Sequence, residues 1–204
     1  MLKRLMLLRH AEAMSNEDRF FAGFKDVPLT PLGIRQAEAL GKRLDHERFD
    51  QVFCSDLGRA RETLRLAKVD APIDYTPALR EKNYGELEGV SWDGKGEYDK
   101  YHLDPFVRSP GGESSLDVQK RVVNYFHTHV VNQGFESVLI VSHHGPIVLL
   151  ACHLLGMPLD RWRTLRMGNA GLSIFSQDEH MMRLTLWNSL SNFGMITNRP
   201  LKKR

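Results

Sequence analysis

The sequence contains little cysteine and no long apolar run, and these two absences exclude several classes of protein. Only Cys54 and Cys152 occur in 204 residues, too few for a secreted domain held together by disulfides. Both lie in apolar stretches, so two buried free thiols in a reducing compartment are expected. No run approaches the roughly 18 apolar residues of a membrane span. The apolar run near the N-terminus is also shorter than the about 7–15 residues of a signal peptide. A cytoplasmic protein with no membrane partner is predicted.

The charge balance also lacks a strong sign. Lysine and arginine number 28 against 25 acidic residues, a net charge of +3, and they are spread along the chain except at 202–204. Nucleic-acid-binding surfaces concentrate cations on one element, so no nucleic-acid partner is expected. A content of 42% hydrophobic and 26% charged residues is typical of a globular protein. The length fits a single domain, 1–204.

Short apolar runs alternate with amphipathic segments, and this alternation predicts the fold. Strands are expected at 5–8, 51–54, 72–75, 137–142, 172–176 and 181–187. Four helices are expected between them: 31–47, capped by Thr30; a segment ending near 67, capped by Ser55 or Asp56; 114–131, capped by Ser114; and 144–155. The pattern predicts an α/β protein, a three-layer α/β/α sandwich with a mostly parallel central sheet. Residues 76–113 have no clear periodicity and are predicted to form a small irregular lid.

Charged and imidazole side chains follow three of the predicted strands directly. Arg9 and His10 end the first strand, Arg59 follows the second, and His143 and His144 follow the run at 137–142. The carboxyl ends of parallel strands meet at one edge of a sheet, where α/β proteins form their binding sites. These five side chains are therefore expected to converge.

A cluster of arginines and histidines requires an anion to offset its charge. The planar guanidinium matches the oxygens of a phosphate, and neutral imidazole is a competent nucleophile. A phosphate site with a histidine nucleophile is therefore one interpretation; satisfied polar groups at strand ends are the other. Metal binding is disfavoured, because His127 and His129 lie two apart on a predicted helix and face different directions. No carboxylate or cysteine completes a ligand set with His143, His144 and His153.

Five stretches, in order, resemble the motifs of the histidine phosphatase superfamily, the phosphoglycerate mutase-like proteins. "LLRHAEAMSN" resembles its signature, "SDLGRARETL" its second motif and "LREKNYGELEG" its acidic motif. "IVSHHGPI" resembles its second histidine motif and "GNAGLSIF" its late strand, and "GGESSLDVQKRV" also has a parallel there. The matches extend from about residue 3 to residue 190.

The resemblance implies a metal-independent phosphomonoesterase that works through a phosphohistidine intermediate and needs no cofactor. It implies that His10 attacks phosphorus, that Arg9, Arg59 and His143 bind the phosphoryl oxygens, and that Glu81 transfers the proton. Only the resemblance selects Glu81 from 25 acidic residues. On the substrate side it implies roles for Asn16 and for the backbone near Gly23.

Two positions depart from the family pattern. Ala11 stands where Gly is usual, a common variation with little consequence. His144 stands where Gly is frequent, so it either contacts the substrate or turns outward to solvent. Arg61 and Arg80 flank the implied site residues in sequence and are interpreted first as solvated surface arginines.

The segment after the acidic motif is shorter than in the mutases of this superfamily. A small lid leaves the phosphoenzyme open to water, which favours a phosphatase over a phosphoglycerate mutase-type transferase. Short members similar to this chain include α-ribazole phosphatases, broad-specificity phosphatases, and fructose-2,6-bisphosphatase-like and phosphoserine phosphatase-like members. The resemblance therefore implies a small phosphorylated metabolite as substrate, with α-ribazole 5′-phosphate and sugar phosphates as candidates.

Three questions stay open at the level of sequence. The segment 90–110 contains side chains that either contact the substrate or pack the lid: Trp92, Tyr98, Tyr101, His102, Phe106 and Arg108. A catalytically inactive phospho-ligand-binding module is disfavoured, because all five implied catalytic positions are present. Whether the chain forms a homodimer is not decided.

Overall fold

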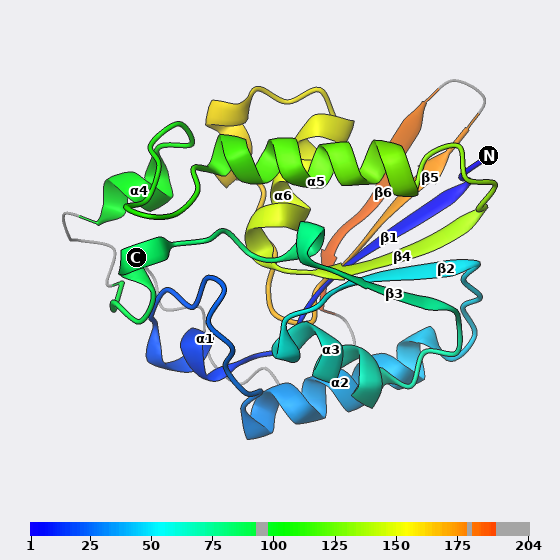
Figure 1. Ribbon diagram of the computed structural model, residues 1–204. Coiled ribbons are helices and arrows are strands. Elements are labelled where there is room, and N and C mark those ends of the chain that lie inside the picture. The colour runs from blue at the N-terminus through cyan, green and yellow to red at the C-terminus, as the bar shows by residue number, and fades with distance from the viewer. Residues whose placement is uncertain (93–97, 179–180, 191–204) are drawn as a thin grey trace.

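Six strands form one sheet in the computed structural model, which describes residues 1–92, 98–178 and 181–190 (Figure 1). They are β1 (Arg4–Arg9), β2 (Gln51–Ser55), β3 (Ile73–Thr76), β4 (Ser137–Ser142), β5 (Leu172–Gln177) and β6 (Met182–Ser189), in the order β3-β2-β4-β1-β5-β6. The first four strands run parallel, whereas β5 is antiparallel to β1 and β6 to β5. The prediction of a mostly parallel sheet is confirmed.

Helices cover both faces of the sheet, which confirms the three-layer arrangement (Figure 1). One face carries α2 (Pro31–Leu44) and α3 (Gly58–Ala67), and the other carries α5 (Ser115–His129) and α6 (His144–Leu154). The short helices α1 (Met14–Asp18) and α4 (Asp99–Leu103) lie beyond the carboxyl end of β1, on the left in Figure 1. Short 3₁₀ helices occur at η1 (Pro77–Leu79), η2 (Gly85–Leu87) and η3 (Leu159–Thr164).

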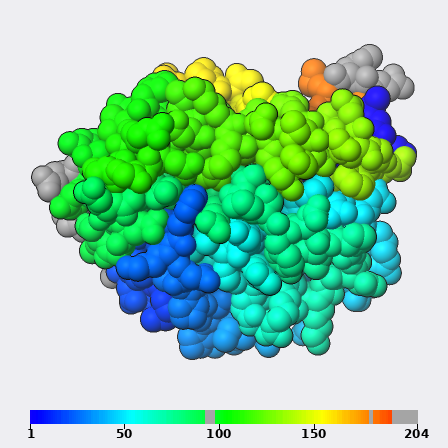
Figure 2. Space-filling model, in the orientation of Figure 1, coloured from blue at the N-terminus to red at the C-terminus, as the bar shows by residue number. Residues whose placement is uncertain are grey.

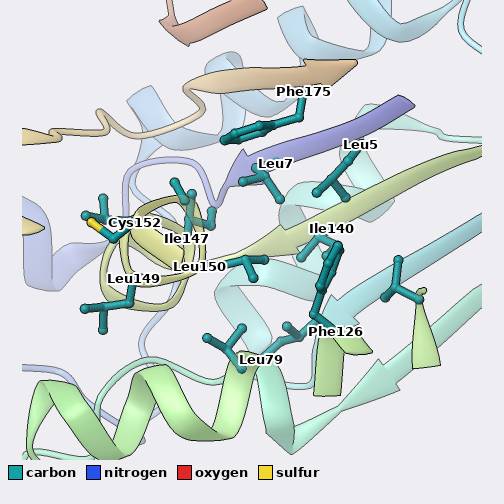
Figure 3. Close-up of a cluster of buried hydrophobic side chains, with 14 of the residues drawn as sticks. Leu5, Leu7, Leu79, Phe126, Ile140, Ile147, Leu149, Leu150, Cys152 and Phe175 are labelled. Atoms are coloured by element: carbon teal, nitrogen blue, oxygen red, sulfur yellow. The ribbon is translucent and has the colours of Figure 1, made fainter. Parts of the chain in front are cut away.

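Strand β1 is buried on both faces, as its continuous apolar run predicts. Leu5 and Leu7 join the cluster with α5 and α6, whereas Met6 and Leu8 join the cluster with α2 and α3. All four are 0% exposed. Figure 3 shows Leu5 and Leu7 in the first of these clusters, beside labelled side chains of α6. Packing on both sides fixes the position of the strand, and hence of the residues at its end.

Two of the predicted helix caps are present. Thr30 Oγ1 accepts a hydrogen bond from Gly33 N at 3.0 Å. Ser114 Oγ accepts from Asp117 N at 3.1 Å, and the Asp117 carboxylate accepts from Ser114 N at 2.8 Å, which completes a capping box.

The cap predicted for α3 is wrong. The helix begins at Gly58, one residue after Leu57, and neither Ser55 nor Asp56 caps it. Instead, Asp26 Oδ1 accepts the hydrogen bond from Gly58 N at 2.9 Å. Asp56 forms a bidentate ion pair with Arg80, with contacts of 2.7 and 2.6 Å. The capping carboxylate thus comes from a distant loop, which local sequence does not reveal.

The described part of the segment 76–113, which excludes residues 93–97, contains little regular structure beyond η1, η2 and α4. Several of its apolar residues pack with Phe21 of the N-terminal segment in a cluster that has Tyr84 and Leu87 at its centre. Figure 2 shows the blue N-terminal segment and the green segment in contact at the same end of the molecule. Both cysteines are buried and free, as expected. Within the described ranges, no helix is long and apolar enough to cross a membrane.

Candidate active site

The carboxyl ends of the parallel strands open onto a cavity of about 830 Å³. Its inner wall brings together Arg9 and His10 after β1, Arg59 from the first turn of α3, Glu81 after η1, and His144 at the start of α6. The predicted convergence on one edge of the sheet is thus present, and residues far apart in sequence become neighbours.

His10 is held in one tautomer by the backbone. Its Nδ1 lies 2.7 Å from the carbonyl oxygen of Ala11, so the ring N–H donates there and Nε2 carries the lone pair. Burial lowers the pKa of His10 well below its usual value, and the neighbouring Arg59 and Arg9 lower it further. The imidazole is therefore neutral at physiological pH, the form that attacks an electrophile.

Arg9 presents an unused donor beside this imidazole. Its Nη1 donates to the carbonyl oxygen of Met167 at 2.7 Å. Its Nε is buried and has no hydrogen-bond partner among the residues that the structure describes. Burial lowers the pKa of Arg9 to about 10, against the opposing charge of Glu81, so the group stays cationic at neutral pH. A buried N–H without a partner is costly, and an anionic ligand would satisfy it.

Arg59 is fixed from three sides. Nη2 donates to Gly23 O at 2.9 Å and Nη1 to Lys25 O at 3.1 Å, and Nε lies 3.2 Å from His143 Nδ1. The side chain is 2% exposed. Gly23 has φ +53°, and a Cβ there would lie 2.0 Å from Glu88 Oε1, so this turn requires glycine. A guanidinium held in this way needs little reorganisation to bind a phosphate.

His143 lies behind His10 rather than among the residues that line the cavity. It is 0% exposed, and the two ring centroids are 5.0 Å apart. Because Arg59 Nε–H donates to Nδ1, the proton of the neutral ring lies on Nε2, 2.8 Å from Ser55 Oγ. Burial lowers the pKa of His143, as do Arg59 and His10. Both ring nitrogens are thus engaged within the protein.

Glu81 is positioned by backbone donors. Its Oε1 accepts from Lys82 N at 2.9 Å and from Gly145 N at 3.2 Å, at the start of α6. A Cβ at Gly145 would lie 2.4 Å from the same oxygen, so only glycine permits this approach. Arg121 donates to the carbonyl oxygen of Glu81 at 3.2 Å. These contacts hold a carboxyl group in the wall of the cavity that contains His10.

Comparison with known proteins identifies the family. The sequence profile of the histidine phosphatase superfamily (branch 1) matches residues 5–190. An adenosylcobalamin/alpha-ribazole phosphatase of Escherichia coli (strain K12) is 31% identical over 194 residues, 91% of this chain and 96% of that protein. The crystal structure of the alpha-ribazole phosphatase from Shigella flexneri superposes with a TM-score of 0.82 at 32% identity, covering 91% of this chain and 96% of that one. The chain belongs to the histidine phosphatase superfamily.

The family also includes relatives of another kind. A 2,3-bisphosphoglycerate-dependent phosphoglycerate mutase of Cytophaga hutchinsonii is 36% identical over 163 residues, 74% of this chain and 76% of that protein. The resemblance inferred from the five motifs is confirmed, and so are the fold and the class of enzyme: the chain is a phosphatase of the histidine phosphatase superfamily.

The expected substrate-side residues of this histidine phosphatase all lie in the cavity wall: Asn16, Gly23 and His144. Asn16 Oδ1 accepts from Asn169 Nδ2 at 2.9 Å, and Asn169 lies at the start of the late motif. His144 turns inward rather than outward to solvent. Its Nδ1 lies 3.3 Å from the carbonyl oxygen of Met167, the acceptor that Arg9 also uses.

The side chains of the segment 90–110 divide between the two roles left open by the sequence. Trp92 and His102 line the cavity. Trp92 also packs against the cluster of Phe21, Tyr84 and Leu87, as do Tyr98 and Tyr101. The other two lie outside the cavity lining: Phe106 is 61% exposed, and Arg108 forms a 2.8 Å ion pair with Asp117.

Sequence reasoning missed the wall formed by η3 and the residues after it. Residues 160–168 line the cavity, as do Lys82 and Tyr84 beside Glu81. The available signal was compositional: Arg161, Arg163 and Arg166 fall within six residues between a helix stop and a strand. Residues 160–168 show no apolar periodicity, so the sequence did not indicate where in the fold they lie.

The flanking arginines and the surface histidines lie away from the cavity. Arg61 stacks on Tyr75, with its Cζ 4.6 Å from the ring centroid, and Arg80 pairs with Asp56. His127 contacts His153 of α6, with 3.0 Å between the Nε2 atoms. Across the described ranges, no three His, Cys, Asp or Glu residues are grouped to hold a metal ion.

Proposed function

We propose that this histidine phosphatase hydrolyses the phosphomonoester of a small metabolite through a phosphohistidine at His10. The observation that carries the proposal is the hydrogen bond from His10 Nδ1 to Ala11 O, which leaves Nε2 free to attack in a cavity that Arg9 and Arg59 also line. Phosphoryl transfer depends mainly on positioning and charge stabilisation. Arg9 and Arg59 supply both, without a metal or cofactor.

In the first step, His10 Nε2 forms a bond to phosphorus while the bond from phosphorus to the leaving oxygen breaks. Glu81 donates a proton to that oxygen, so an alcohol departs. The Arg9 and Arg59 guanidiniums donate to the phosphoryl oxygens as charge builds on them. His143 supports this set from behind, through Arg59 and His10.

In the second step, water attacks the phosphorus of phosphohistidine. Glu81, now ionised, accepts a proton from the water, the N–P bond breaks, and His10 returns to its neutral form. Inorganic phosphate leaves, and His10 is regenerated with Nε2 unprotonated. Atoms and charge therefore balance over the cycle. The short segment after the acidic motif supports hydrolysis over transfer to a second acceptor, because it leaves the intermediate accessible to water.

Asn16, the backbone at Gly23, and His144 are proposed to contact the substrate, since all three line the cavity. The named activities of the relatives support a small phosphorylated metabolite; α-ribazole 5′-phosphate and sugar phosphates are the first candidates. The two buried free thiols favour the cytoplasm. Neither nucleic acid nor a partner chain enters the proposed mechanism, and light scattering tests whether a homodimer forms.

A screen for inorganic phosphate release from phosphorylated metabolites tests the proposal. We expect hydrolysis of several esters, unaffected by EDTA and inhibited by vanadate, which mimics five-coordinate phosphorus. Strong inhibition by EDTA would contradict the metal-independent mechanism. Interconversion of 3- and 2-phosphoglycerate faster than hydrolysis of p-nitrophenyl phosphate would show that the enzyme is a mutase instead.

A further inference from the structure

The cavity wall beyond the inner site carries an excess of positive charge. Four cationic residues line it in addition to Arg9 and Arg59; we call them the cationic wall: Lys82, Arg161, Arg163 and Arg166. Against them, the described lining contains one acidic residue other than Glu81, namely Asp160. Arg9 and Arg59 offset the negative charge of a phosphoryl group bound at His10. The positive charge of the cationic wall is then not offset by that group.

The three arginines of the wall have no partner for their charge within the described parts of the chain. They are exposed, and no ion pair or side-chain hydrogen bond engages their guanidinium groups. Arg80 and Arg121, by contrast, each pair with a carboxylate, Asp56 at 2.6 Å and Glu113 at 2.9 Å. Unpaired guanidiniums around a cavity are available to a ligand.

Lys82 is a buried cation in the lining of the same cavity. It is 4% exposed, its Nζ donates to the carbonyl oxygen of Tyr101, and it lies 5.3 Å from the centroid of the Tyr84 ring. Burial lowers the pKa of Lys82 to about 8, although nearby carboxylates oppose the shift. A buried ammonium is costly without an anion, and a bound anion would offset that cost.

The positive field of the wall reaches the histidines in the cavity. Burial is the main cause that lowers the pKa of His102 to about 4, and Arg163 and Lys82 lower it further. Burial and then Arg9 lower the pKa of His144 to about 4, and Arg166 adds to this. Both imidazoles are neutral near pH 7, so they neither add to nor cancel the charge of the wall.

We propose that the cationic wall binds a second anionic group, a carboxylate or a second phosphate, carried on the leaving group of the substrate. This inference rests on the proposed phosphatase function and narrows its substrate to phosphomonoesters with a further negative charge. A cavity of about 830 Å³ has room for such a leaving group beyond the phosphoryl site. Arg163 and Arg166 act as specificity residues, and their charge contributes to binding rather than to the chemical step.

A matched pair of esters tests the proposal. 4-Carboxyphenyl phosphate and 4-carbamoylphenyl phosphate have nearly the same shape, but only the first carries a second anion; 1,4-phenylene bisphosphate extends the comparison to phosphate. We expect kcat/KM to be about fivefold or more higher for the carboxylate, mainly through KM, and the ratio to fall with added salt. The Arg163→Gln/Arg166→Gln double variant should lower this ratio, because it weakens binding of the carboxylate ester more than binding of the carbamoyl ester. Arg61→Gln, which removes an exposed arginine away from the cavity, should keep the wild-type ratio.

The outcomes separate this inference from the proposed function. Equal kcat/KM for the two esters in the wild-type enzyme, or a ratio that the double variant leaves unchanged, would overturn the anion site while the phosphatase function stands. If neither ester is hydrolysed, the proposed function fails. Calorimetric binding of both esters to His10→Ala then decides the anion site separately, since tighter binding of the carboxylate supports it and equal binding overturns it.

Discussion

The inner site and the cationic wall share one cavity but are built in opposite ways. In the inner site, His10, Arg59 and His143 are at most 3% exposed, and each is held by hydrogen bonds to the protein. The arginines of the wall lie on η3 and the residues after it, are exposed, and have no ion-pair partner within the described ranges. The inner site is thus preorganised, whereas no ion pair or side-chain hydrogen bond within the described ranges holds the guanidinium groups of the wall.

Because of this difference, we expect the two regions to have different functions. Preorganised charge stabilises a transition state without reorganisation, which is what phosphoryl transfer needs. Exposed, flexible cations contribute modestly to binding and respond to salt. Changes to the inner site should therefore reduce turnover by orders of magnitude, and changes to the wall should alter the choice of substrate by small factors.

The largest effect is expected from His10→Ala, which removes the proposed nucleophile. Turnover should fall by at least about 10³-fold, since losing a catalytic nucleophile leaves only the contribution of binding and charge. Brief incubation with substrate followed by intact-mass spectrometry should detect a phosphorylated protein in the wild type and none in the variant. A variant that keeps normal turnover would contradict the role of His10, and with it the contrast between the two regions.

Glu81→Gln should have the next largest effect, and its size should depend on the leaving group. A general acid contributes about 10²–10⁴ when the leaving alkoxide is a strong base and much less when it is a weak one. We expect a large loss of kcat/KM, which reports the first step alone, with an alkyl phosphate and a small loss with p-nitrophenyl phosphate. Equal losses of kcat/KM with both esters would indicate that Glu81 does not protonate the leaving oxygen.

The inner site could largely be predicted from the sequence because its residues lie at the ends of short apolar strands. The run from Leu5 to Leu8 is buried on both faces, so Arg9 and His10 had to emerge at the edge of the sheet. Glu81 has no such local signature. It lies after a 3₁₀ turn in an irregular segment, and only the resemblance to a known family selected it from the acidic residues.

The wall and the α3 cap could not be predicted because they depend on contacts between distant segments. Asp26 caps a helix whose first residue is Gly58, and no local pattern links the two. The segment that carries Arg163 and Arg166 has no periodicity that places it over the carboxyl edge of the sheet. The sequence left two orientations open for the His144 side chain. The inward orientation depends on the carbonyl oxygen of Met167, which lies in a different segment of the chain.

Asp26→Ala tests how far the inner site depends on this distant cap. The variant removes the acceptor for Gly58 N at the start of the helix that carries Arg59. The free energy of unfolding should fall by about 1 kcal/mol, within the roughly 0.5–2 kcal/mol typical of lost caps. The loss of kcat/KM, converted to free energy, should be smaller than this. Urea denaturation measures the first quantity. Glu62→Ala on the same helix loses an exposed pair with Arg65, and a loss as large as that of Asp26→Ala would argue against a capping role.

The smallest effect is expected from the titration of Lys82 and tests the wall alone. Burial lowers the pKa of the Lys82 amine to about 8. The amine is therefore charged below about pH 8 and loses its charge as the pH rises above this value. The ratio of kcat/KM for 4-carboxyphenyl and 4-carbamoylphenyl phosphate should therefore fall between pH 7 and pH 9 as one of four positive charges is lost. The fall should be about two- to threefold, the size typical of one partly screened charge.

The Lys82→Met variant is the control, because it keeps an apolar side chain of similar length and removes the amine. The ratio in this variant should no longer change with pH. A wild-type ratio that stays constant over this range would place Lys82 outside the anion-binding wall and leave that role to the arginines.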